Sequence, residues 1–444
     1  MILVLTAIIV YAVYKGCDLL WVLIAASIII CVMNGLPVWD TMNSSFLSGA
    51  NEFFQNLFFK LLMSIIFGEF FSYSGAAASL AGILSKALLK NGTEERKRTM
   101  AIAMMLLLGY GLCLIGMDTY ACLFALIPVT MSIFQETNIP RRFVPALLLG
   151  GISVAAASPL APLFGNIICS ALFGITASAA LIPGFVAAIV ILVLSFLYLN
   201  RAVKKACAEG EAFTCGSYVM IDNSELNPVH PLIGILPLLA LFISYSIIGI
   251  AIEYACLIGI ALCCVLFYKN LCKSIANQGE AKNRYIGTLN KAAHQWAPLI
   301  LMFGVSAGMA SVIQLTPAYE MINNIFITLA EKLNPLVSVA LCTTFSGFLS
   351  GAAANSVFFA APIYGPVLDQ LGLTGAMVHR IATFAIAILD TIPIAPCVVT
   401  ALAACGVSQK EGYKPIFMTT VLNIAIGLVV LILIIALFPG LAAN

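Results

Sequence analysis

The stretch that decides the fold is Leu389-Asp-Thr-Ile-Pro-Ile-Ala-Pro396, which interrupts the apolar run 376–405 with an acidic residue and two prolines. Proline removes a backbone hydrogen-bond donor and clashes with the preceding helical turn, so a helix breaks where two prolines stand close together. A second apolar run, 143–176, carries Pro159 and Pro162 in its middle. We therefore expect two helices that are broken midway.

The prolines of the two runs repeat with the same spacing. Pro128, Pro159 and Pro162 are separated by 31 and 3 residues, and so are Pro362, Pro393 and Pro396, at a constant offset of 234. Three matched prolines in stretches of matched hydropathy make chance a minor explanation. Interrupted segments at corresponding places in two halves point to the central site of a transporter.

The composition indicates a membrane protein. Of the 444 residues, 62% are hydrophobic and 9% are charged, and the mean hydropathy is +1.07. Soluble domains carry about a quarter charged residues, so a soluble enzyme is excluded. A net charge of +2 is too small to indicate nucleic-acid binding. The cysteines and the three histidines lack the spacing of a metal site, and we expect neither a metal nor a cofactor.

The apolar runs predict the order of the elements. We expect crossings over 1–15, 19–34, 57–76, 178–199, 230–249, 252–268, 295–316 and 416–438. The Gly-centred runs 99–135 and 334–372 are expected to be re-entrant hairpins. The halves 1–200 and 230–444 are joined by the polar linker 201–229. The predicted fold class is an all-α polytopic membrane protein of two inverted-topology repeats, with about ten transmembrane helices, two re-entrant hairpins and two Pro-broken helices.

The basic residues predict the orientation of this topology. All but three of the 21 Lys and Arg residues then lie on one face, and the exceptions are Lys60, Lys332 and Arg380. Because cytoplasmic loops are rich in Lys and Arg, that face is cytoplasmic. We expect a multi-pass protein of the plasma (inner) membrane, with the linker 201–229 in the cytoplasm and both termini outside.

Three carboxylates lie in apolar surroundings, where a charge is expensive and a functional role is the default hypothesis. They are Asp390 at the second break, Asp118 after the Gly-rich tip of the first hairpin, and Glu69 within 57–76. Each could carry a proton, and the alternative for each is a hydrogen-bonded acid that stabilises a break or a hairpin. Asp390 is the leading proton carrier.

A bound anion would depend on backbone N–H groups at the breaks and on nearby polar side chains. No Lys or Arg lies at either tip or break in the sequence, and His379-Arg380 is expected at the outer start of the second broken helix, where it could steer anions or extend to the headgroups. The candidate ligands, some of which could instead be helix-packing residues, are Ser153, Ser158, Asn166, Ser346, Ser350, Asn355, Ser356 and Thr391.

At several of these positions the sequence resembles the gluconate:proton symporter (GntP) family. The similar stretches are Gly68 to Ala77, Asn138-Ile-Pro-Arg141, Gly165-Asn166-Ile-Ile168, Lys204 to Phe213, His379-Arg-Ile-Ala382, Leu389 to Pro393 and Cys405 to Lys414. The resemblance covers nearly the whole chain. It implies proton-coupled uptake of gluconate or a related small hydroxy acid, a homo-oligomer such as a dimer, and elevator-like movement of the hairpin-containing part.

The departures from the family pattern fall on the expected site. The family has Gly-Thr where this chain has Leu160-Ala161, and His-Asn where it has Ile394-Ala395. Leu112 and Cys113 stand at the first hairpin tip where the family favours Gly and Ser. The site is more apolar than a gluconate site, which leaves open a less hydroxylated acid as the substrate.

These observations favour a secondary transporter of a small organic anion, driven by a proton gradient, with alternating access around the tips and breaks. A sodium-coupled carboxylate transporter is the first alternative, because unwound carbonyls can bind Na⁺. A channel would need a continuous polar stripe, which is not evident. An intramembrane enzyme would need two carboxylates nearly in contact, and Asp118 with Asp390 is the pair to examine.

Overall fold

The protein is helical throughout the part that its structure describes. This computed structural model describes residues 17, 19–76, 79, 92–117, 119–216, 229–248, 250–272, 284–350, 357, 372–393 and 395–442, and no strand occurs among them. The predicted all-α polytopic fold is confirmed. The first expected crossing, 1–15, and the second arm of the second hairpin lie outside the described residues.

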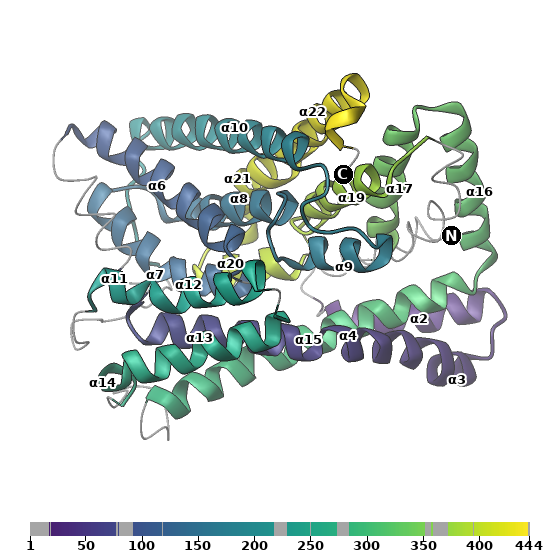
Figure 1. The fold of residues 1–444 in the computed structure, drawn as a ribbon, viewed down its shortest axis with the longest axis horizontal. Helices are drawn as coiled ribbons and strands as arrows, with labels where there is room; N and C mark the ends of the chain where they lie inside the picture. Colours follow the sequence, from purple (N-terminus) through teal and green to yellow (C-terminus); the bar gives the residue numbers. More distant parts are fainter. Residues whose placement is uncertain are drawn as a thin grey trace.

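The helices form two layers (Figure 1). The first layer contains α2 (Leu19–Met33), α3 (Val38–Thr41), α4 (Leu47–Tyr73), α11 (Pro231–Gly234), α12 (Leu236–Phe242), α13 (Ile252–Leu266), α14 (Tyr268–Leu271) and α15 (Arg284–Gln314). The second contains α6 (Glu94–Leu114), α7 (Thr119–Thr137), α8 (Val144–Ala157), α9 (Phe164–Phe173), α10 (Leu181–Ala208), α17 (Pro335–Ser350), α19 (Gly375–Leu389), α20 (Pro396–Ala404), α21 (Gln409–Ile416) and α22 (Asn423–Leu437). Helix α16 (Pro317–Lys332) follows α15 in the chain and contacts both α15 and α17.

Both halves of the chain contribute to both layers, and corresponding helices pack against each other. Helices α4 and α15 are antiparallel, because Gly49 approaches Ser311 at one end while Phe70 contacts Tyr285 at the other. Helices α10 and α22 also pair, and Ser195 accepts a hydrogen bond from Asn423. Antiparallel pairing of matched helices is what an inverted repeat requires. The inverted repeat itself stays a prediction.

Several predicted boundaries were wrong. Helix α10 continues to Ala208, eight residues into the expected linker, because the stretch after Arg201 consists largely of good helix formers and Lys204 forms an ion pair with Glu95 of α6. Helices α4 and α15 begin about ten residues earlier than their apolar cores, since polar turns extend them. Helix α16 was not predicted.

Among the residues that the structure describes, three helical segments are long and apolar enough, by length and composition, to cross a membrane. They are α6, α10 and the continuous segment Gln409–Leu437, which joins α21 to α22. Shorter apolar helices include α13 and α19. Helix α6 has 21 residues, about 31 Å at the helical rise of about 1.5 Å per residue. Re-entrance of the first hairpin therefore stays a prediction.

Candidate functional site

The first helix break is a six-residue segment, 158–163, between α8 and α9. Pro159 and Pro162 lie inside it, as the sequence predicted, and both are buried. Leu160 has a positive φ of 65° and is 48% exposed. Its backbone N–H donates to the carbonyl of Ala177, 3.0 Å away, in the loop after α9. The break is therefore an ordered turn and not a frayed helix end.

Two of the candidate ligands hold this turn together. Asn166, in the first turn of α9, is fully buried, and its Nδ2 donates to the carbonyls of Ala156 (3.3 Å) and Ser158 (2.9 Å). The hydroxyl of Ser158 donates to the carbonyl of Val154 at 2.8 Å. Unwinding α8 frees carbonyls that a side chain must satisfy when they are buried. Asn166 meets that need.

Arg380 is a central residue of the first break. It lies near the start of α19, as expected, but it is buried, so the expected contact with anions in solution or with headgroups was wrong. Its side chain is fully buried. Its Nη1 donates to the carbonyl of Ala157, the last residue of α8, at 3.1 Å and to Oδ1 of Asn166 at 2.9 Å. Nε and Nη2 donate to the carbonyls of Ala179 and Ala177 at 2.7–3.0 Å. A cation is favoured at the negative end of α8, which explains this position.

The guanidinium of Arg380 is satisfied by neutral acceptors. Its remaining contact is the hydroxyl of Thr383 at 3.4 Å. The ion pairs within the described residues are Lys97–Glu94, Arg142–Glu211, Lys204–Glu95 and Lys205–Glu209, and none includes Arg380. An arginine keeps its charge even when buried. Hydrogen bonds therefore satisfy its donors while leaving its positive charge without a carboxylate in the described part of the chain.

His379, its neighbour on α19, faces α9. It is fully buried, and its Nε2 is 3.1 Å from the hydroxyl of Ser170. Its Nδ1 has no hydrogen-bond partner in the described structure. It too lies near the start of the second broken helix, as expected, but α9 covers it, so it is not exposed to anions or headgroups.

The turn of the first hairpin meets the same break. A Cβ at Gly116, between α6 and α7, would lie 3.3 Å from Cγ of Pro162 and 2.7 Å from Leu241 of α12. The hydroxyls of Tyr110 and Ser158 are 3.4 Å apart. From the first layer, the ring of Phe53 lies 6.4 Å from that of Phe164 at the start of α9. The hairpin tip and both layers therefore converge on this break.

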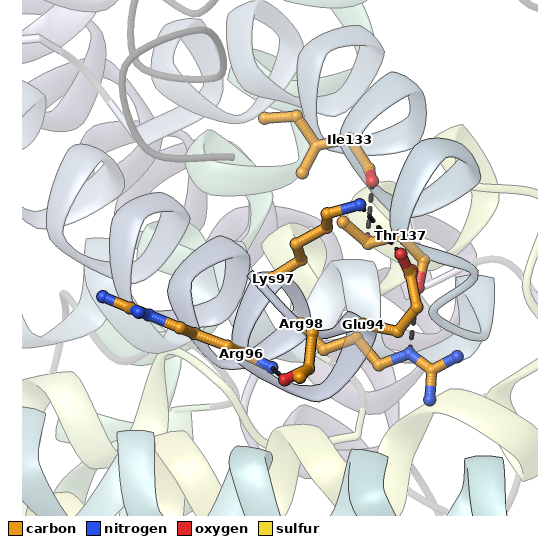
Figure 2. A network of polar contacts seen from close by, with 7 residues as sticks. Glu94, Arg96, Lys97, Arg98, Ile133 and Thr137 are labelled. Carbon is orange, nitrogen blue, oxygen red and sulfur yellow. Dashed lines mark hydrogen bonds and ion pairs between the residues drawn. The ribbon is translucent and has the colours of Figure 1, made fainter. Parts of the chain in front are cut away.

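The open ends of the hairpin are joined at the opposite end of α6 and α7. Arg98 donates through Nε to the carbonyl of Thr137 at 2.9 Å, and Lys97 pairs with Glu94 at 2.8 Å (Figure 2). The hydroxyl of Thr93 caps α6 by accepting from the N–H of Arg96. The bond from Arg98 to Thr137 joins α6 to α7 at this end, while the other two contacts stabilise the start of α6.

The second break is also six residues long, 390–395, between α19 and α20. Asp390 is the C-cap residue of α19, and its backbone carbonyl accepts from the thiol of Cys397 at 2.6 Å. Gln409 donates to the backbone carbonyl of Pro393 at 2.8 Å, and the hydroxyl of Tyr413 donates to the backbone carbonyl of Thr391 at 3.3 Å. Pro396 is the first residue of α20. Within the described residues the carboxylate of Asp390 forms no hydrogen bond.

The other candidates do not gather at these breaks in the described structure. Glu69 lies on α4, buried beside Phe70 and Phe71 in the core. Ser153 is buried within α8. Ser346 and Ser350 lie in the last turns of α17, where the structure describes the backbone alone. Asp118, Asn355 and Ser356 lie outside the described residues, so the separation of Asp118 from Asp390 stays open.

Comparisons with known proteins agree with a transporter. No family model matches the chain. It is 24% identical over 473 residues to the uncharacterized transporter YxjC of Bacillus subtilis, covering 96% of both chains. Its fold is similar to that of the YdaH transporter of Alcanivorax borkumensis, with 13% identity, a TM-score of 0.54 and 99% of each chain covered. These similarities indicate a membrane transporter, and they do not single out the gluconate:proton symporter family.

Proposed function

We propose that this protein is a secondary active transporter of small organic anions. One observation carries the proposal. Arg380 is a buried cation at an unwound segment, and neutral groups alone satisfy its donors in the described structure. A buried charge that is not paired costs free energy, and binding of an oppositely charged group reduces that cost. A substrate carboxylate would supply that charge during the transport cycle.

Backbone donors at the two breaks strengthen the case for an anion. Helix α9 begins at Phe164, and the side chain of its N-cap residue, Leu163, forms no cap hydrogen bond. Helix α20 likewise begins after Ala395 without a side-chain cap. Uncapped first turns present N–H groups and the positive end of the helix dipole, which suit a carboxylate. Asn166 links the α9 terminus to Arg380, so the dipole and the cation act on one region.

Asp390 is our candidate for coupling transport to a proton gradient. It is the C-cap residue of α19, ten residues after Arg380, so about 15 Å separates the two along the helix. Its carboxylate has no hydrogen bond within the described structure, and such a group can take up a proton without first breaking an ion pair. The carbonyls of the break make Na⁺ the alternative coupling ion.

The two layers suggest how access alternates. Helices α6–α10 and α17–α22 carry both breaks, and they meet α4 and α15 of the first layer through α7 and α17. We propose that the second layer moves against the first, in the elevator manner implied by the resemblance to gluconate symporters. Gluconate or a related hydroxy acid, an inner-membrane location and a homodimer belong to the same proposal.

Uptake by the purified full chain in liposomes tests this function. A panel of labelled sugar acids and hydroxy acids would be offered with a pH gradient, with a Na⁺ gradient and with neither. We expect accumulation of at least one anion above equilibrium under the pH gradient, and loss of that accumulation in Arg380→Gln. Uptake that never exceeds equilibrium under either gradient would favour a channel. Chemical conversion of an acid would favour an enzyme.

A further inference from the structure

Two side chains of α21 hold the backbone of the second break. The hydroxyl of Tyr413 donates to the carbonyl of Thr391 at 3.3 Å, and the amide of Gln409 donates to the carbonyl of Pro393 at 2.8 Å. Buried carbonyls of an unwound segment need such partners, and Thr391 is 1% exposed. Because Thr391 directly follows Asp390, the two bonds fix the backbone that carries the proposed proton carrier.

The two breaks differ in how well their contacts are shielded from water. Arg380 and Asn166, which hold the first break, are fully buried. Tyr413 and Gln409 are only half-buried. Their neighbours on the other side of α21 and at its start are exposed, namely Ser408, Lys410, Glu411 and Lys414. Water competes for the donors and acceptors of a hydrogen bond near the surface, so the contacts of the second break are the ones that can open during a transport cycle.

The helix that carries these two side chains has a hinge just after them. Pro415 lies inside α21, and the segment 417–422 that follows is a π-helix. Helices bend at prolines and at π-helical turns. Within that π-helix the hydroxyl of Thr419 donates to the carbonyl of Ala146 on α8 at 3.2 Å, which anchors the helix from there on. Such a joint would let α21 tilt while α22 stays in place.

We propose that α21 is a gate over the second break, held closed by Tyr413 and Gln409. When α21 tilts, water from the side of Lys410 and Lys414 reaches the break, and Asp390 exchanges its proton with that side. This inference rests on the proposed function. Coupling by alternating access requires that the carrier communicate with one side of the membrane at a time. Tyr413 and Gln409 are therefore positioning residues, which act through Asp390.

Alkylation of Cys397 measures the opening of this gate. Its thiol lies in the break and is 8% exposed. The purified full chain would be treated with a water-soluble maleimide, and mass spectrometry of its peptides would give a rate for each cysteine. We expect Tyr413→Phe with Gln409→Met to label Cys397 about tenfold faster than the natural chain, the scale of one net hydrogen bond. An unchanged rate would overturn the gate. Cys169, which is fully buried on α9, should stay slow if the fold is intact, and exposed Cys17 gives the rate of an accessible thiol.

Transport distinguishes a gate from a contact that only supports the fold. In liposomes, the double variant should still exchange labelled anion across the membrane but should lose accumulation under a pH gradient, because Asp390 is no longer closed to one side. Tyr285→Phe is the matched control. It removes a hydroxyl that also donates to a backbone carbonyl, that of Cys264 at 3.0 Å, and it should change neither measurement. If the double variant accumulates the anion as the natural chain does, the gate fails and the transport proposal survives. If the natural chain accumulates no anion, both fail.

Discussion

Nη1 of Arg380 donates to Oδ1 of Asn166 at 2.9 Å, and this bond joins residues that are 214 positions apart in the chain. Arg380 belongs to α19 of the second half, and Asn166 belongs to α9 of the first half. Helix α19 of the second half therefore stabilises the break between α8 and α9 of the first half. Such a contact makes the geometry of the first break depend on both halves at once.

The charge of Arg380 can be tested without removing it. Thr383 lies on α19 one turn after Arg380, and its hydroxyl is 3.4 Å from Nη1. In Thr383→Asp, a carboxylate would pair with the guanidinium and compete with a substrate anion. For an anion bound roughly 8 Å from the guanidinium, and an effective dielectric constant of about 20, the attraction is worth about 2 kcal/mol. Neutralising the guanidinium with aspartate would therefore weaken anion binding ~30-fold. Titration of the anion that the liposome assay identifies measures this loss.

Thr383→Asn is the control for this experiment, because asparagine has the shape of aspartate and no charge. We expect its anion affinity to stay within about threefold of the natural chain, a difference of under 1 kcal/mol. Equal losses in the aspartate and asparagine variants would mean that packing around Thr383, which is 1% exposed, matters and charge does not.

Replacing Arg380 by lysine separates its charge from its hydrogen bonds. A lysine ammonium has three N–H donors at one point, whereas the planar guanidinium has five that point in different directions. Lysine therefore cannot donate to the carbonyls of Ala157, Ala177 and Ala179 and also to Asn166. Each buried acceptor left alone costs about 1–3 kcal/mol. We expect Arg380→Lys to unfold in detergent at a clearly lower temperature than the natural chain. A thermal midpoint equal to that of the natural chain would show that the carbonyls do not need the guanidinium.

The prolines allowed much of this fold to be predicted, whereas the burial of Arg380 against the first break was missed. Two prolines within four residues break a helix in almost any context, so both breaks were visible in the sequence. The position of Arg380 depends on tertiary packing of α19 against the loop after α9, and a helix boundary estimated from hydropathy cannot show that. A signal was present, since an ionisable residue beside a long apolar run is a functional hypothesis by default.

The repeat also shows where sequence spacing and structure differ. The prolines are offset by 234 residues. The breaks begin at Ser158 and Asp390, which are 232 residues apart, although each break is six residues long. Pro162 therefore lies inside its break, whereas Pro396 begins the next helix, a position that proline favours. Spacing located both breaks, and it could not fix their ends to the residue.

Close packing of α6 on α8 gives a further prediction. A Cβ at Gly151 would lie 2.4 Å from the carbonyl oxygen of Leu106 and 3.0 Å from the backbone nitrogen of Tyr110. Gly151→Ala would therefore push the helices apart, at a cost of about 1–3 kcal/mol. Gly150→Ala is the matched control, because its nearest contact is at 3.4 Å. Thermal unfolding should show a lower midpoint for the first variant alone, and equal midpoints would refute the contact.

Asp390 provides the test of energy coupling. If this carboxylate carries the proton, Asp390→Asn removes the titrating group while preserving size and the backbone bonds to Ile386 and Cys397. The variant should then exchange labelled substrate across the liposome membrane but fail to accumulate it under a pH gradient, because binding of the anion no longer depends on a proton. Asp390→Glu keeps an acid at this position and should retain part of the accumulation. A variant with asparagine that still concentrates the anion would exclude Asp390 as the proton carrier and turn attention to Glu69 and Asp118.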